Sequence, residues 1–188
     1  MKHVHTREQF EAETQKLVGL TLSDVVYYEI EYDTPDPFYL RHPEIGHFLD
    51  HGLDLIATDG QCHSFLWDGA FYQYGIGLFP HTAANEVNTN RLWRVSDHDD
   101  WIPLIGRTIT SANVYWSWID SAATDERDRT YYPQDVCLSF TGDQRVYISA
   151  AQYMEASNTV MGMSDEILVV FRESVARKYR IGPYAKDA

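Results

Sequence analysis

Alternation of apolar and polar residues with a period of two runs through most of this chain and limits the folds open to it. The clearest run spans residues 25–33, where Val26, Tyr28, Ile30 and Tyr32 alternate with Tyr27, Glu29, Glu31 and Asp33. Successive side chains of a strand point to opposite faces, so this run predicts a half-buried strand. Its wet face is expected to carry Tyr27, Glu29 and Glu31. Two prolines shortly after the run end the strand.

Further strands are predicted wherever such runs lie between turn signals. They fall within residues 53–79, 111–119, 135–140, 145–150 and 166–171. Asp59-Gly60 predicts a hairpin turn of type I′, in which both central residues need a positive φ. Helical patterns are confined to the two ends of the chain. A capping box that starts at Thr6 opens a helix over 6–18, and a short helix is expected over 174–180.

These elements predict a mainly-β fold, α+β at the margin, in a single domain over residues 1–188. We expect a twisted antiparallel sheet, a sandwich or a partly open barrel, with an N-terminal helix and a short C-terminal helix. Residues 80–100 and 120–133 are polar and rich in turn formers, and they are predicted to be long loops.

The charge balance excludes several classes of partner. Twenty-eight acidic residues against 15 basic ones give a net charge of −13. Nucleic-acid binding is not expected, because it requires a basic face for the phosphates. No apolar run approaches the roughly 20 residues that span a bilayer, so no membrane association is expected. The first residues lack the apolar segment of a signal peptide, which favours a cytoplasmic location.

The two cysteines give no sign of a cofactor. Cys62 and Cys137 lie in strand-like runs, and the chain contains no CxxC motif. Reduced, buried thiols are therefore expected, and no cofactor is predicted.

Five residues are candidates for ligand binding: Tyr27, Glu29, Glu31, Trp116 and Trp118. Glu29 and Glu31 share a strand face, and paired carboxylates at comparable spacing carry out glycosidase chemistry. An acidic face on an edge strand also prevents edge-to-edge pairing, and this second interpretation is favoured. Trp116 and Trp118 share a strand face that lines either a ligand cavity or the core. We favour the core for that face.

Three histidines lie close together in sequence. If Pro43 starts a helical turn, His47 and His51 share a helix face, and His42 lies just before it. Two imidazoles at this spacing could hold a divalent metal. Solvated or hydrogen-bonded histidines in a polar loop are the simpler interpretation, so no metal ligand is assigned.

No motif fixes a reaction, and no catalytic residue is assigned. The leading hypothesis is a non-enzymatic protein that binds a basic protein through an acidic, aromatic-bearing surface. Small inhibitors and immunity proteins of basic toxins or nucleases share this charge profile, which is an analogy of charge alone. Acidic loop residues such as Asp97, Asp99 and Asp100 are candidates for that surface.

Two alternatives stay open. One is a small-molecule-binding barrel or sandwich with a Tyr/Trp-lined pocket, and with weak hydrolase activity at the paired carboxylates. The other concerns self-association. The last segment is locally basic, with Arg172, Arg177, Lys178, Arg180 and Lys186. Regions of opposite charge on one protein would suit a homodimer.

Overall fold

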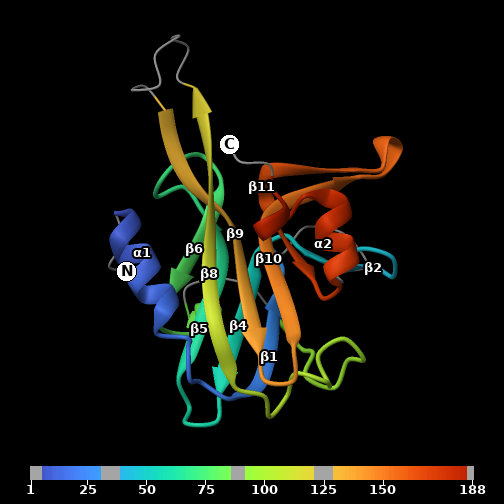
Figure 1. Ribbon diagram of the computed structural model, residues 1–188. Coiled ribbons are helices and arrows are strands. Elements are labelled where there is room, and N and C mark those ends of the chain that lie inside the picture. The colour runs from blue at the N-terminus through green and yellow to red at the C-terminus, as the bar shows by residue number, and fades with distance from the viewer. Residues whose placement is uncertain (1–5, 31–38, 86–91, 121–128, 186–188) are drawn as a thin grey trace.

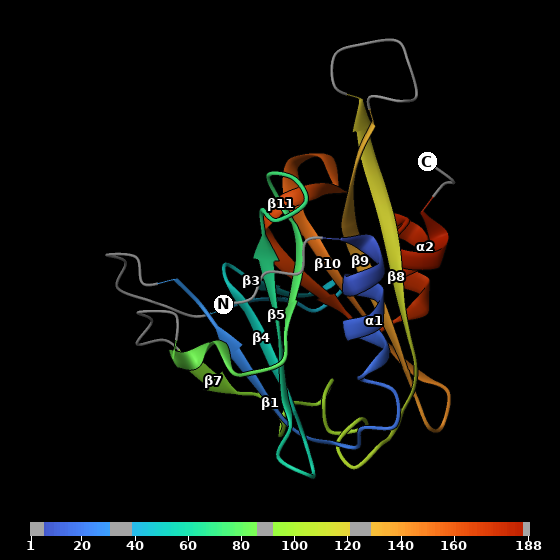
Figure 2. The same cartoon turned by 90° about the vertical axis from the view of Figure 1, so that its left-hand side faces the viewer.

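A computed structural model describes residues 6–30, 39–85, 92–120 and 129–185, and it shows two antiparallel sheets packed face to face (Figure 1, Figure 2). The first sheet has the order β6 (Gly75–Phe79), β5 (Cys62–Asp68), β4 (Gly52–Ala57), β1 (Leu22–Tyr28), β7 (Leu92–Arg94). The second has the order β2 (Leu40–His42), β3 (Gly46–Leu49), β11 (Thr159–Val170), β10 (Gln144–Met154), β9 (Arg129–Phe140), β8 (Ile109–Asp120). The predicted mainly-β fold is confirmed, and of the three expected forms the sandwich is observed.

The main core fills the space between the sheets. Leu53 and Phe65 of the first sheet meet Val136, Ile148 and Ile167 of the second, and all five are fully buried. Strand alternation sends every second residue of these strands into this layer, as expected for aligned sheet packing. A second apolar cluster covers the outer face of the six-stranded sheet, where α2 (Glu173–Tyr179) packs (Figure 1).

Both predicted helices are confirmed. α1 (Arg7–Gln15) begins after Thr6, whose hydroxyl accepts a 3.2 Å hydrogen bond from the backbone N–H of Gln9. It lies along β8 (Figure 2), and Phe10 closes the side of the sandwich there. The helix is shorter than the predicted 6–18, because residues 16–18 form tight turns instead of continuing it. Of the helices in the described ranges, none has the length and apolarity needed to cross a membrane.

The wet face predicted for residues 25–33 is wrong. β1 ends at Tyr28 and lies between β4 and β7, so it is not an edge strand. Tyr27 faces the core between the sheets and is fully buried. On the other face, Val26 and Tyr28 pack in a smaller cluster with Leu66 and Phe79. Period-two alternation identified two faces, but the face that carries Tyr27 and Glu29 was misjudged as solvent-exposed.

The hairpin at Asp59-Gly60 is confirmed, but its turn type is not. Only Gly60 has a positive φ, 86°, and its N–H donates to the carbonyl of Ala57 across 3.0 Å. This is a three-residue loop with glycine in the left-handed position. The Asp59 carboxylate accepts a hydrogen bond from the N–H of Gln61, which fixes the turn without a second positive φ.

The two predicted long loops contain ordered structure. The stretch 80–100 includes η1 (Ala83–Asn85) and β7, which pairs with only three residues of β1 and is too short to show a period. Within 120–133, β9 begins at Arg129, and residues 121–128 lie outside the described part of the chain. Pro133 sits beside a bulge, where a strand tolerates proline. Cys62 and Cys137 are both free thiols.

Candidate functional site

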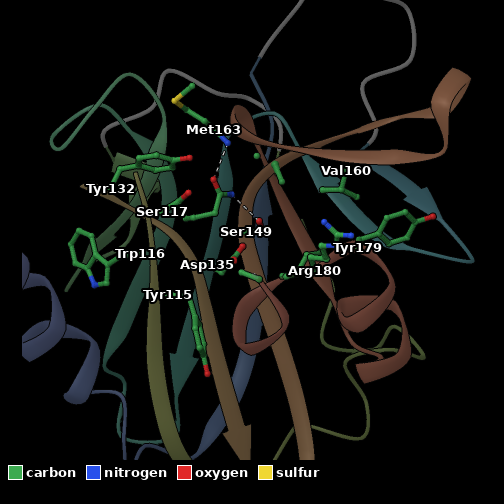
Figure 3. A pocket seen from close by; sticks show the side chains of 15 residues that line it. Tyr115, Trp116, Ser117, Tyr132, Asp135, Ser149, Val160, Met163, Tyr179 and Arg180 are labelled. Carbon is green, nitrogen blue, oxygen red and sulfur yellow. Dashed lines mark hydrogen bonds between the residues drawn. The ribbon is translucent and has the colours of Figure 1, made fainter. Parts of the chain in front are cut away.

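The six-stranded sheet forks near its middle. Pairing between β9 and β10 runs from Phe140↔Gln144 to Asp135↔Ser149 and stops there. Each strand then continues with its outer neighbour alone, β9 with β8 as far as Asp120↔Arg129 and β10 with β11 as far as Met154↔Thr159. The two hairpins diverge (Figure 1), and a cleft of about 440 Å³ lies at the fork (Figure 3).

Irregular pairing at the same level explains the fork. Gln134 is an extra residue in β9, between the pairs Pro133↔Trp116 and Asp135↔Tyr115. In β11, residues 163–166 are left over between the pairs that Ala150 and Ala151 make. Bulges of this kind bend a strand and increase its twist, so adjacent strands separate. Met163 takes a left-handed φ of 56°, which marks the bend in β11.

The side chain of Gln134 joins the two arms of the fork. Its amide nitrogen donates to the Ser149 hydroxyl at 3.1 Å and to the carbonyl of Ala150 at 2.8 Å. Its amide oxygen accepts from the backbone N–H of Met163 at 2.9 Å (Figure 3). A Cβ on Gly162 would lie 2.7 Å from that oxygen, so glycine is needed for the amide to fit. The amide replaces main-chain bonds that the diverging strands no longer make.

Asp135 anchors the C-terminal segment beneath the fork. Its carboxylate accepts a 2.8 Å hydrogen bond from the N–H of Gly182, which begins η4 (Gly182–Tyr184). The residue is 2% exposed, and burial raises the pKa of its carboxyl to about 6. Hydrogen bonds from Ser149 and from Gly182 oppose that shift only in part. Burial without a cationic partner disfavours the charged form.

Tyrosines and apolar residues, together with Ser117 and Arg180, line the rest of the cleft. They come from both arms and from the end of α2: Tyr115, Ser117, Tyr132, Val160, Met163, Tyr179, Arg180. Figure 3 shows Tyr132 on the β9 arm and Val160 and Tyr179 on the opposite side. The cleft therefore combines aromatic walls with a polar base of amide, hydroxyl and carboxyl groups.

Of the five predicted ligand-binding residues, the four that the structure describes do not come together. Trp116 alone borders the cleft, and its ring points away toward α1, where its N–H donates to Glu11 at 3.0 Å (Figure 3). It packs against the main core, as favoured for that face. Trp118 lies further along the arm beneath the guanidinium of Arg129, 3.7 Å from its ring centroid. Glu31 lies outside the described residues.

Tyr27 belongs to a buried polar chain. The indole N–H of Trp101 donates to its hydroxyl at 2.6 Å, and the hydroxyl bonds Nδ1 of His47 at 2.8 Å. Burial raises the pKa of Tyr27 well above its usual value. A hydroxyl enclosed in this way holds the fold together and cannot meet a ligand directly.

The helical turn at Pro43, on which the histidine metal site depended, does not form. Residues 43–45 form the turn of a hairpin between β2 and β3, closed by a 3.0 Å bond from the N–H of Ile45 to the carbonyl of His42. His47 consequently points into the protein, 1% exposed, while His51 follows the next turn. Within the described ranges, no three His, Cys, Asp or Glu side chains are arranged to hold a metal ion.

A group of carboxylates flanks the fork on the β11 side, and we call Glu29, Asp50, Asp165 and Glu166 the carboxylate group. Glu29 accepts a 3.0 Å bond from the N–H of Asp50. Burial first, and then the negative charge of Asp165, raise the pKa of Asp50. Burial and the charges of Asp50 and Asp165 likewise raise the pKa of Glu166. Asp165 and Glu166 belong to the same extra segment of β11 as Met163, which Gln134 holds.

Sequence reasoning missed most of this site. It singled out Glu29 but paired it with Glu31. The other members of the carboxylate group come from the turn after β3 and from β11, more than 20 and more than 130 positions away. The one sequence feature that could have pointed to the site is the polar stretch just before the apolar run at 167–170. Comparison of the chain with protein-family models, with curated proteins and with solved structures finds no significant match.

Proposed function

We propose that this is a cytoplasmic, non-enzymatic binding protein that holds an extended, basic segment of a partner protein in the cleft of the forked sheet. The observation that carries the proposal is the end of β9–β10 pairing at Asp135↔Ser149. Beyond it, residues 129–134 of β9 and 150–154 of β10 each keep a described strand partner on one side only.

Such strand edges favour an extended polypeptide. A peptide can add to an exposed edge through main-chain hydrogen bonds, while pockets beside the edge select its side chains. Tyr179 lines the cleft and is partly exposed, so it offers an aromatic face of the kind that is enriched where proteins meet. Aromatic faces also attract cationic side chains.

Charge supports a basic occupant. The chain carries −13 overall, and Asp165 and Glu166 of the carboxylate group lie in the same extra segment of β11 as Met163, which lines the cleft. Asp50 and Glu166 are raised in pKa partly by a neighbouring negative charge, and a cation placed beside them would relieve that repulsion. Arg180 lies at the α2 side of the cleft, so the cationic residues of the segment should face the β11 bend.

A small organic molecule is the second candidate. The cleft volume of about 440 Å³ falls within the usual range of small-molecule sites. The aromatic walls and polar base would suit a ring that carries hydrogen-bonding groups. This candidate places the ligand in the same cleft and needs no partner protein.

The test compares two variants with the same charge change on the same strand. Ser117→Arg places a cation and added bulk in the cleft, whereas Thr110→Arg does so outside it. Immobilised protein captures partners from lysate of the source cells, and the captured protein is then purified and titrated against each variant. We expect the captured partner to be basic. Its affinity for Ser117→Arg should be at least about ten-fold lower than for Thr110→Arg, and its affinity for the unmodified protein should fall as salt rises.

Equal binding by the two variants, or a partner that is acidic, would contradict the proposal. Retention of a small molecule by the purified protein, displaced by Ser117→Arg, would favour the second candidate. Circular dichroism of each variant shows whether the fold is retained.

A further inference from the structure

A second cavity, of about 240 Å³, lies at the opposite edge of the six-stranded sheet from β8. It opens where the β2–β3 hairpin meets the junction of β11 and α2. Its polar and aromatic lining includes Arg41, His42, His47, Asp100, Phe171 and Arg172. None of these residues lines the fork, so the inference below is independent of the proposed function.

Two guanidinium groups in this cavity are fixed by single hydrogen bonds. Arg41 donates to the Asp100 carboxylate at 3.0 Å, and Arg172 donates to the carbonyl of Pro43 at 2.9 Å. A guanidinium has five N–H donors, so one bond that fixes its position leaves donors for another acceptor. Preorganised arginines of this kind suit the planar oxygens of carboxylate and phosphate.

The Asp100 carboxylate already accepts hydrogen bonds from side chains of the protein itself. Besides the bond from Arg41, its Oδ2 receives the Nε2–H of His47 at 3.1 Å. Nδ1 of His47 accepts from the Tyr27 hydroxyl, and that hydroxyl accepts from the indole N–H of Trp101. Each hydrogen bond in this series therefore has a defined donor and acceptor. Burial lowers the pKa of His47 to about 4, and the ring is neutral at physiological pH.

The charge of the lining is therefore positive. Asp100 balances Arg41, and the neutral His47 adds no charge, which leaves Arg172 in excess. In a chain of net charge −13, two arginines that meet at one cavity are a local exception. The long-range field of the protein repels anions, so an anion would be held there by direct contacts.

The apolar part of the lining is rigid. The ring of Phe171 lies 4.9 Å from that of Trp101 and 5.0 Å from that of His47, measured between centroids.

We propose that this cavity binds a small oxyanion, a carboxylate or phosphate group, which Arg41 and Arg172 hold while Phe171 forms the wall beside it.

The experiment is an NMR titration of the full chain with sodium phosphate and, separately, with sodium acetate, at ionic strength held constant with sodium chloride. We expect saturable shifts of the side-chain Nε–H signals of Arg41 and Arg172 with at least one of the two anions. Saturation by phosphate alone assigns a phosphate ligand, and saturation by acetate alone assigns a carboxylate.

Three variants locate the site. Arg172→Gln should weaken binding about ten-fold or more, since a charged hydrogen bond is lost. Arg41→Gln should do the same, which covers the case in which Arg172→Gln fails to fold. Arg107→Gln, an exposed arginine outside the cavity, should bind as the unmodified protein does. The proposal is overturned if neither anion gives saturable shifts, or if affinity is unchanged in Arg172→Gln or Arg41→Gln.

Discussion

The side-chain amide of Gln134 donates to the carbonyl oxygen of Ala150 across 2.8 Å, just beyond the last main-chain pair between their strands. One side chain thus bridges the point at which the six-stranded sheet divides. The cleft depends on this bridge, because the same amide also fixes Ser149 and the bend at Met163.

Replacing Gln134 with alanine should therefore weaken the fold. The variant loses three hydrogen bonds and leaves the N–H of Met163 without its acceptor, for an expected loss of about 2–3 kcal/mol in the free energy of unfolding. Urea denaturation measures it. The control is Gln152→Ala, which removes a bond to Glu166 and should cost about 1 kcal/mol or less. Equal losses in both variants would show that Gln134 is not the bridge.

Asp135 should make stability depend on pH. The pKa of its carboxyl is raised from 3.8 to about 6 in the folded protein, so its contribution is most favourable below pH 4 and is lost as pH rises through 6. Asp135→Asn should consequently gain stability relative to the unmodified protein between pH 4 and 7.5. The gain corresponds to about 3 kcal/mol at most. A difference in stability between Asp135→Asn and the unmodified protein that is the same at every pH would contradict the burial argument.

Tyr27→Phe should destabilise the protein although it removes a single oxygen. The N–H of Trp101 and Nδ1 of His47 would both lose a buried partner, at an expected cost of about 2–3 kcal/mol. Thermal or urea unfolding gives the value. Tyr131→Phe, on a tyrosine that is 45% exposed, should change stability by less than about 0.5 kcal/mol. If Tyr27→Phe were as stable as Tyr131→Phe, the hydrogen bonds of the Tyr27 hydroxyl to Trp101 and His47 would not stabilise the fold.

The pKa values of Asp50 and Glu166 should depend on the charge of Asp165. Asp165 contributes to the raised pKa of both Asp50 and Glu166, so Asp165→Asn should lower the pKa of each. Carboxyl carbon NMR shifts followed against pH measure both groups in one series. Glu155→Gln, a change of equal charge at a residue absent from both interactions, should leave the two pKa values in place. If neither pKa moved in Asp165→Asn, the charge of Asp165 would not be a cause of the raised values.

The sequence predicted the elements better than their burial. Local signals were sufficient for the helix that Thr6 caps and for the hairpin of residues 135–150, because caps and tight turns act within a few residues. The exposure of Tyr27 was misjudged because its hydroxyl partners, Trp101 and His47, lie 74 and 20 positions away. A tyrosine on an alternating strand gives no sign of whether a second sheet will cover it.

The fork could not be predicted for a related reason. It arises from extra residues in two strands that are not neighbours in sequence, and from an amide of β9 that reaches β10 and β11. Nothing in the sequence marks Gln134 or Gly162 as part of a site. The need for glycine at position 162 follows only from its close approach to the amide oxygen of Gln134. The candidate carboxylates show the same pattern, since only Glu29 was found and the rest of the group comes from segments far away in the sequence.

Hydrogen exchange of the backbone amides, with and without the captured partner, tests the central claim most directly. Binding in the fork predicts slowed exchange at residues 129–134 and 150–154, the two strand edges that face the cleft, with little change in β4 and β5. Slowed exchange confined to another surface, such as the turn that contains Asp97 and Asp99, would contradict it.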